Sequence, residues 1–423
     1  RGALDEADAL NSDLFKREYE NRIERSKYRM FLTPLNQRGG IQTADQLTER
    51  LRFVREKDFS DWVGRLESFD EYMAQTIALM RQGIREGRVH PRVIMKRVPA
   101  QIDAQLVATA IESPFYAPFR AAPESVDPAR FEALAGRARA AIDEKVLPAF
   151  RGFALFFNDE YLPACRESVG ARELPDGAAF YEFRARDYTT TDLTPDEIHQ
   201  IGLKEVARIR AEMYEIIEKV GFEGSFSEFL EFLRTDPQFY YDNPDDLFEA
   251  YLATSKRIDP ELVKLFGKLP RMPYGLRPSP AASAPDTTTA YYSRPAADGS
   301  RAGYYYVNLY RPDVRPKYEI EVLSVHEAMP GHHLQIALAQ ELGELPAFRR
   351  YGGFTAFVEG WGLYSESLGD ELGLYKDPYS KFGQLTYEMW RAVRLVVDTG
   401  MHYKGWSRGR AIEFFSDNAA KTE

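Results

Sequence analysis

Residues 326–335 read His-Glu-Ala-Met-Pro-Gly-His-His-Leu-Gln, inside an otherwise apolar stretch that predicts a helix. The pattern is close to His-Glu-x-x-His, in which two histidines one helical turn apart bind a single zinc ion. A Pro-Gly pair is inserted here, and a regular helix would carry neither His332 nor His333 close enough to His326 to share an ion. Because proline lacks the backbone N–H and glycine tolerates unusual backbone angles, we expect the helix to bulge at this pair. The bulge makes His332 the second ligand and leaves His333 as its neighbour.

An alternative is that these histidines only end a helix and pack against aromatic side chains. The chain has six histidines, however, and three of them lie within residues 326–333, beside Glu327. Such a cluster next to an acid favours a metal site over a helix end.

A catalytic zinc ion needs three protein ligands and an open position for water, so a third donor is expected on another segment. Residues 352–368 form an apolar, aromatic helix pattern whose two acids, Glu359 and Glu366, lie two turns apart on one face. We predict Glu359 as the ligand, because an acid buried among aromatic residues is costly without a cation. Glu366, at the more polar end, then supports a ligating histidine from behind. The alternative, a solvated acid on an amphipathic helix, fits Glu366 better than Glu359.

The segment that precedes the histidine motif carries the β signal. Residues 287–294 and 302–310 are rich in threonine and tyrosine and are joined by a loop with an Asp-Gly pair, a pattern typical of a hairpin. An edge strand before a zinc helix could hold an extended peptide through backbone hydrogen bonds, with Tyr306 and Asn308 as candidate substrate contacts. A lid or a packing ribbon is the alternative, left open by the sequence.

A further helix is predicted over residues 387–402, where Arg391, Arg394, Asp398 and His402 follow one stripe of a mainly apolar pattern. Charges at this spacing often line a cleft. We expect the arginines to pair with a substrate carboxylate or with acids of the site. Asp398 would orient His402, a candidate catalytic donor to the developing oxyanion. The alternative is a ladder of salt bridges within the helix.

Beyond these patterns, the segment 304–406 resembles the bacterial domain-of-unknown-function 885 family, whose hallmark is His-Glu-Ala-x-Pro-Gly-His-His-x-Gln followed by Glu-Gly-Trp. The resemblance extends to the stretches that begin at Val93, Ser113, Thr189 and Asp398, so it covers nearly the whole chain. It implies a helix-rich zinc peptidase with a deep cleft, similar in outline to the glutamate-zincins. Family members usually continue further, so we expect a carboxy-terminal segment that this sequence lacks.

Composition indicates ample apolar material for a core. Of the 423 residues 44% are hydrophobic, and no apolar run approaches the roughly 20 residues of a transmembrane helix. The net charge of −10 argues against a nucleic-acid partner. The single cysteine, Cys165, excludes an internal disulfide framework but fits either cytoplasm or periplasm. Because the first residue is Arg1, a targeting segment could have been removed, and we favour a periplasmic or cell-envelope location. The oligomeric state is not indicated.

Helical periodicity dominates the rest of the chain. It appears in residues 4–31, 45–56, 60–86, 100–111, 127–158, 194–220, 225–234, 244–256 and 259–266. Pro, Gly, Ala and Ser concentrate in 269–286, which we interpret as a connection. The prediction is a mostly α-helical fold with a small β-hairpin before the zinc helix. Residues 1–268 form a helical body and residues 269–423 a zinc-bearing catalytic region, packed as one unit.

The sequence therefore predicts a zinc-dependent hydrolase of peptide or peptide-like amide bonds. His326, His332 and Glu359 hold Zn²⁺, which acidifies a water molecule and polarises the scissile carbonyl. Glu327 takes the proton of the water and returns it to the leaving amine. The alternatives are a metal-dependent hydrolase of a non-peptide amide and a metal-dependent peptide-binding protein without turnover. The presence of Glu327 disfavours the binding protein, and neither the cleavage preference nor exo- or endopeptidase action is indicated.

Overall fold

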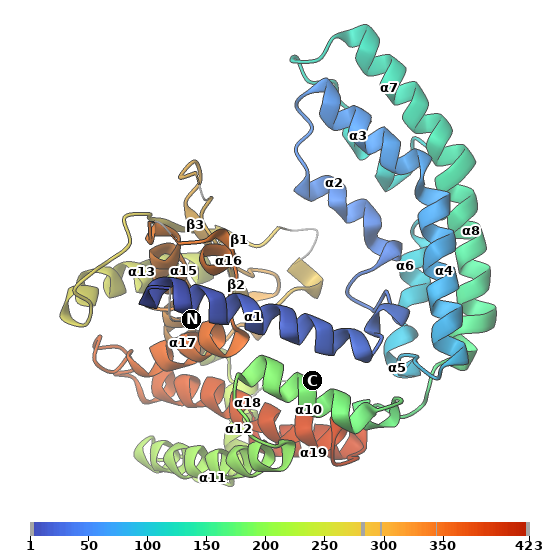
Figure 1. The fold of residues 1–423 in the computed structure, drawn as a ribbon. Coiled ribbons are helices and arrows are strands. Elements are labelled where there is room, and N and C mark those ends of the chain that lie inside the picture. Colours follow the sequence, from blue (N-terminus) through green and yellow to red (C-terminus); the bar gives the residue numbers. More distant parts are fainter. Residues whose placement is uncertain (1–3, 281–283, 297, 344, 420–423) are drawn as a thin grey trace. The chain divides into compact units, whose positions relative to one another are not determined.

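The computed structural model describes residues 4–280, 284–296, 298–343 and 345–419. The chain forms two compact units that are described separately here. Arg1–Asn21 and Tyr181–Glu423 make up the unit with the histidine motif, called the motif unit, and Arg22–Phe180 make up the helical unit. Both units are built mainly from helices, which confirms the predicted mostly α-helical class (Figure 1).

The helical unit is a set of helices around one buried apolar cluster. Its helices are α2 (Leu47–Arg50), α3 (Glu56–Glu67), α4 (Phe69–Arg85), α5 (Arg92–Met95), α6 (Val98–Asp103), α7 (Pro128–Ala141), α8 (Leu147–Phe156) and α9 (Leu162–Ala164). The π-helical turns Ile142–Val146 and Phe157–Tyr161 join the last three of these, so the helix predicted over 127–158 is present and continues to Ala164. Helix α3 packs on α7, and α4 packs on α8.

Two predicted helices of this unit are much shorter than expected, because acidic side chains bind the backbone N–H groups that a longer helix would use. Over 45–56 the helix ends at Arg50, and Asp58 then accepts hydrogen bonds from the backbone of Val54 and Arg55. Over 100–111 the helix ends at Asp103, and Glu112 accepts from the backbone of residues 108 and 109. The helix predicted over 60–86 is also divided, at Ser68.

The motif unit contains the longest helices of the fold. The boundaries between the units fall within α1 (Glu6–Lys27) and α10 (Gly177–Thr189), so each of these helices belongs partly to the motif unit. The other helices of the motif unit are α11 (Pro195–Lys219), α12 (Phe226–Thr235), α13 (Pro244–Ile258), α14 (Ile320–Glu327), α15 (His332–Glu341), α16 (Ala347–Tyr351), α17 (Thr355–Ser367), α18 (Pro378–His402) and α19 (Arg408–Asn418). The helix predicted over 259–266 is a 3₁₀ helix, Asp259–Lys264. None of the described helices is long and apolar enough to cross a membrane.

Helices α11 and α18 pack closely along each other. The contact requires glycine at residue 202, because a Cβ there would lie 2.8 Å from the side chain of Leu395. This packing brings residues before and after position 268 into one unit. The predicted boundary after residue 268 therefore falls inside the motif unit, and the compact units divide near residues 21 and 180 instead.

A small mixed sheet precedes the motif, and its strand order is β1-β3-β2. The predicted hairpin is present, since β2 (Ala290–Ser293) pairs antiparallel with β3 (Gly303–Val307). The segment 269–286, predicted as a connection, also contains a strand, β1 (Tyr274–Pro278), which pairs parallel with β3. Its sequence has no apolar alternation, so its pairing depends on the edge that β3 offers. Strand β2 remains at the edge of the sheet.

The motif lies in a buried part of its unit. One apolar cluster involves α11, α12 and α18, and a second surrounds α13, α14 and the sheet. Val322, Leu323 and Val325 of α14 are buried in the second cluster. This burial holds α14 and the first histidine of the motif in a fixed position.

Candidate metal centre

The histidine motif lies on two helices rather than on one bulged helix. Helix α14 ends at Glu327 and α15 begins at His332, so the chain breaks where a bulge was predicted. The break depends on Gly331, because a Cβ on this residue would lie 1.9 Å from the carbonyl oxygen of His326. The indole N–H of Trp361 donates to the carbonyl of Pro330 at 2.8 Å and holds the turn.

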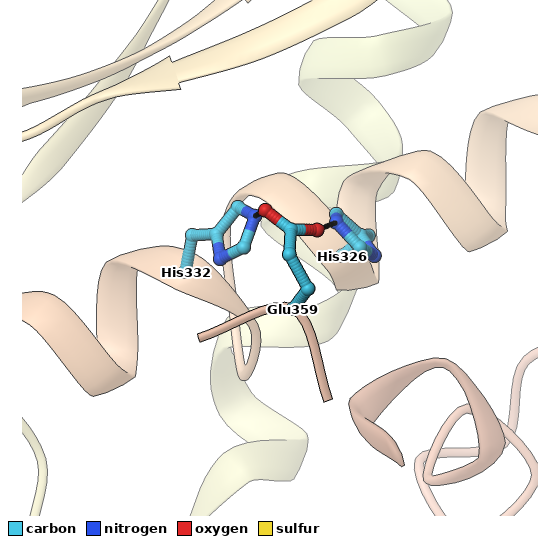
Figure 2. A group of neighbouring side chains, drawn as sticks. All are labelled: His326, His332 and Glu359. Carbon is cyan, nitrogen blue, oxygen red and sulfur yellow. Dashed lines mark ion pairs between the residues drawn. The ribbon is translucent and has the colours of Figure 1, made fainter. Parts of the chain in front are cut away.

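Figure 2 shows that His326, His332 and Glu359 converge on one point, with the carboxylate between the two imidazoles. The ring centroids of the histidines are 4.6 Å apart. The Nε2 atom of each histidine lies 3.8 Å from an oxygen of Glu359. The ligand-type atoms of the three residues all lie within 4.8 Å of one another. The structure thus brings together the three residues that the sequence predicted as ligands.

The spacing of these three groups fits a metal ion. A distance of 3.8 Å is too long for a hydrogen bond. It is close to the roughly 3.4 Å that separates two ligand atoms on a tetrahedral zinc ion with bonds of about 2.0–2.1 Å. Two imidazole nitrogens and a carboxylate oxygen are also donors that zinc prefers.

Both imidazoles are in the protonation state that a metal requires. Removal from water, followed by the charge of Arg391, lowers the pKa of His326 to about 4. Removal from water, followed by the charge of His326, lowers the pKa of His332 to about 4. Both rings are therefore neutral at pH 7, and neither must lose a proton to bind a cation.

Glu366 supports His326 from the opposite side of the ring, as predicted. Its carboxylate is fully buried and lies 2.7 Å from Nδ1 of His326. A neutral imidazole that donates from Nδ1 presents the lone pair of Nε2 toward Glu359. Arg391 also contacts the Glu366 carboxylate, at 3.2 Å, so a cation compensates the buried acid.

The reason for which Glu359 was predicted is wrong, although its position is as expected. The side chain of Glu359 is 59% exposed, so it is not an acid buried among aromatic residues. The buried acid of α17 is Glu366, which was predicted at the polar end. The exposed face of α17 carries apolar residues such as Phe357, which mislead an argument from composition.

A cavity of about 910 Å³ adjoins the three residues. Its walls include residues 287–292, the loop 313–316, Glu359, the part of α18 around Arg391, and Leu323, His326 and Glu327 of α14. Glu327 lines this cavity next to the convergent groups. Removal from water, with a further contribution from the charge of Glu359, raises the pKa of Glu327 to about 8. A hydrogen bond from the backbone of Tyr292 opposes this shift.

Of the predicted substrate contacts, the two arginines reach the cavity. Arg391 is already engaged, because it contacts Glu366 and donates to the carbonyl of Tyr387. Arg394 is exposed and lies over the ring of Trp390, 5.3 Å from its centroid.

Asp398 and His402 lie elsewhere and do not line the cavity. His402 is about 12 Å further along α18 than Arg394 and stacks on Tyr181. Asp398 accepts a hydrogen bond of 2.5 Å from the Tyr181 hydroxyl and lies 3.8 Å from His402. The predicted pair of Asp398 and His402 therefore exists, but it joins α18 to α10 and does not face the candidate metal site.

Tyr306 and Asn308 also lie outside the cavity lining. Tyr306 stacks on Tyr291 across the hairpin, with 4.8 Å between ring centroids. Asn308 is fully buried, and its amide donates to the carbonyls of Ala284, Thr287 and Thr288. A side chain that is saturated by backbone carbonyls is a structural residue.

His333 connects the motif to the sheet. Its Nε2 lies 2.9 Å from the carbonyl of Met272, and its Nδ1 lies 2.7 Å from the hydroxyl of Tyr292. A carbonyl only accepts, so Nε2 carries the proton and Nδ1 accepts from Tyr292. Both ring nitrogens are thus used, and His332 is the histidine that faces His326.

Three residues that matter at the site were not found from the sequence. Tyr292 was part of the predicted hairpin without a role, and Arg315 directly precedes Pro316 in a loop with no periodicity. Gly362 lies against the imidazole of His326, where a Cβ would be 2.6 Å from Cε1. The Gly-x-Gly pattern inside a predicted helix was the available signal, because glycine there implies a close approach.

We expect Gly362→Ala to destabilise the protein by about 1–3 kcal/mol, because the added methyl group meets the buried ring of His326. Gly360→Ala is the matched control on the same helix, since nothing lies within 4 Å of its added Cβ. It should stabilise by about 0.5–1 kcal/mol. Urea unfolding of both variants measures the difference, and equal effects would contradict the close contact.

Comparison with known proteins identifies the family of this chain but assigns no activity to it. A protein-family model described as "Bacterial protein of unknown function (DUF885)" matches residues 1–423. A solved structure of "the putative lipoprotein from Colwellia psychrerythraea" is similar with a TM-score of 0.81 and 30% identity, over 92% of this chain and 68% of that chain. No curated protein matches the chain.

A second solved structure, "a putative lipoprotein of unknown function from Shewanella oneidensis", is similar with a TM-score of 0.54 and 17% identity. The match covers 99% of this chain and 80% of that chain, and at this identity it shows the fold alone. The family model spans the full sequence, and it includes the segment with the His-Glu motif. The chain therefore belongs to the DUF885 family of bacterial proteins of unknown function.

Proposed function

We propose that this chain is a zinc-dependent hydrolase of peptide bonds. The observation that carries the proposal is the convergence of two neutral imidazoles and a carboxylate, with Glu327 beside them at the wall of a cavity. His326, His332 and Glu359 would hold the ion. Two histidines and a glutamate from a later helix are also the ligand types of the His₂Glu zinc peptidases, which supports the peptidase assignment.

The edge strand β2 supports a peptide as the substrate. Its residues line the cavity, and the free side of an edge strand offers backbone N–H and C=O groups to an extended chain. The backbone of Tyr292, at the end of β2, bonds to Glu327. A peptide paired with β2 would therefore place one of its carbonyl groups near Glu327.

Glu327 performs the proton transfers in the proposed reaction. As a carboxylate it takes a proton from the attacking water molecule, and as a carboxylic acid it returns the proton to the leaving amine. Lewis acidity toward the scissile carbonyl oxygen and toward a water molecule is the chemistry that zinc would supply at this position. Glu366 and Arg391 keep His326 in place throughout, because they hold its Nδ1 side.

A peptide library tests the proposal. The protein, loaded with zinc, should convert a mixed library of short peptides into defined fragments detectable by mass spectrometry, and a chelator should stop the conversion. Retention of peptides without fragments would instead indicate a metal-dependent peptide-binding protein. If peptides are neither bound nor cleaved while other amides are hydrolysed, the substrate is a non-peptide amide and the peptidase proposal is wrong.

We also infer a cell-envelope location. The similar structure from Colwellia psychrerythraea, 30% identical to this chain, is described as a "putative lipoprotein", and a lipoprotein is held at a membrane by its lipid anchor. Cell fractionation followed by detection with an antibody tests this, and recovery in the cytoplasmic fraction would contradict it.

A further inference from the structure

Arg315 is a partly buried cation in the wall of the cavity. Its Nε donates to the carbonyl of Tyr310 at 3.3 Å, and its Nη1 donates to the hydroxyl of Thr289 at 3.1 Å. Both acceptors are neutral. Among the residues that the structure describes, Arg315 forms no ion pair. Removal from water lowers the pKa of Arg315 from its ordinary value. The charge of the buried Glu319, which lines the same cavity, opposes this shift but offsets it only in part.

The other arginines of the cavity differ from Arg315. Arg391 contacts the buried carboxylate of Glu366. Arg234 lies 3.8 Å from Glu231, and Arg394 is exposed to solvent. The guanidinium group of Arg315 is partly enclosed, and its N–H groups that do not bond to Tyr310 or Thr289 can donate to an anion. Because arginine stays charged at all ordinary pH values, an anionic group of a ligand is the partner that would compensate it.

The position of Arg315 relative to β2 indicates which anion this is. Thr289, which binds Arg315, directly precedes β2, whereas Tyr292, which binds Glu327, lies near the other end of the strand. Residues three apart in a strand are separated by about 10 Å. A peptide antiparallel to β2, with its reacting carbonyl near Glu327, would extend its C-terminal part toward Arg315. A parallel peptide would bring its N-terminal ammonium group there, and the like charges would repel.

We propose that Arg315 binds the C-terminal carboxylate of the substrate, so that the protein removes one to three residues from the free C-terminus of a peptide. This inference rests on the proposed peptidase function for the cleavage, but not for the binding. It assigns the substrate class as short peptides with a free α-carboxylate. Arg315 acts as a specificity residue and takes no part in the bond-breaking step.

The test uses one N-acetylated tetrapeptide library prepared in two forms, with free C-terminal carboxylates and with C-terminal carboxamides. Zinc-loaded Glu327→Gln protein is the binding probe, and the retained peptides are counted by mass spectrometry after affinity selection. We expect the peptides with a free C-terminal carboxylate (the acids) to be retained about 10- to 100-fold better than those with a C-terminal carboxamide (the amides). This is the difference expected when a charge-assisted hydrogen bond is lost. Arg315→Ala in this background should abolish the preference. Arg315→Gln, which can still bond to Thr289, should abolish it too and covers the case that the alanine variant fails to fold.

Lys317→Ala is the matched control, because it removes the same charge two residues away. Lys317 donates to the carbonyl of Gln238 and does not line the cavity. This variant should keep the preference for acids. Equal retention of acids and amides, an equal loss in the control, or a preference for acidic side chains regardless of the terminus would each overturn the assignment.

Turnover by the parent protein separates the two proposals. Acids that are selectively bound but never cleaved would contradict the peptidase function and leave the role of Arg315 intact. Amides that are cleaved as fast as acids would contradict the role of Arg315 and leave the peptidase function intact. Cleavage of acids one to three residues from the C-terminus, slowed at least about tenfold in Arg315→Gln, supports both.

Discussion

Replacement of either candidate histidine ligand is expected to abolish metal binding. The parent protein should hold about one zinc ion per chain after dialysis, and His326→Ala and His332→Ala should each hold close to none. The reason is that two remaining ligands cannot retain an ion that needs three from the protein. Glu359→Gln should weaken binding in the same assay, since an amide oxygen is a poorer zinc ligand than a carboxylate. Elemental analysis of the dialysed proteins measures all of these effects.

His333→Ala is the control for the histidine variants. It removes an imidazole from the adjacent position, but this ring is used by Tyr292 and Met272 and not by the candidate site. The variant should therefore keep its zinc. Full zinc in His332→Ala together with loss in His333→Ala would reverse the assignment of the second ligand.

The convergence of the candidate ligands could be predicted from the sequence because its main part is local. His326 and His332 are six residues apart, and the chemistry of the Pro-Gly pair between them leaves few ways for both to face one ion. The predicted bulge was nevertheless a complete break between two helices. A bulge and a complete break both bring the same ring nitrogens together. The error in the predicted backbone therefore did not change which histidines were expected to face each other.

Glu359 lies at the expected position, but for a different reason than the one predicted. Aromatic neighbours suggested burial, yet the outer face of α17 is exposed and Glu366 is the buried acid. Sequence periodicity identifies the two faces of a helix but not which face packs inward when both carry apolar residues. The inward face of α17 is set by Gly362, which admits the ring of His326.

The remaining site residues depend on tertiary contacts that no local pattern reports. The stripe of α18 divides between two environments, since Arg391 and Arg394 reach the cavity while His402 packs against Tyr181 of α10. Arg315 lies in a loop and acquires its position through Thr289, 26 residues earlier in the chain. Sequence spacing could not identify Tyr181 as the partner of His402 or Thr289 as the partner of Arg315, because helix geometry fixes neighbours only within one element.

Glu327→Gln is expected to lower turnover about 10²–10⁴-fold while the zinc content stays at that of the parent. The amide cannot accept the proton of the attacking water, and it is nearly the same size as the carboxyl group, so the cavity should be preserved. Zinc analysis and peptide turnover on the same preparation separate this effect from loss of the ion. Glu321→Gln is the matched control on α14, because Glu321 binds the backbone of Tyr375 and does not line the cavity. Its turnover should stay close to that of the parent.

The pH dependence gives a second, independent signature of Glu327. A general base acts in its deprotonated form, so turnover by the parent should rise with pH as Glu327 loses its proton. Burial and the charge of Glu359 raise the pKa of this carboxyl group to about 8, and a bound cation would lower it again, so the rising limb should lie at or below pH 8. Glutamine does not titrate, and the residual activity of Glu327→Gln should lack this limb. If the variant keeps the limb, or turns over within roughly threefold of the parent, another group is the base, because general-base assistance contributes far more than that.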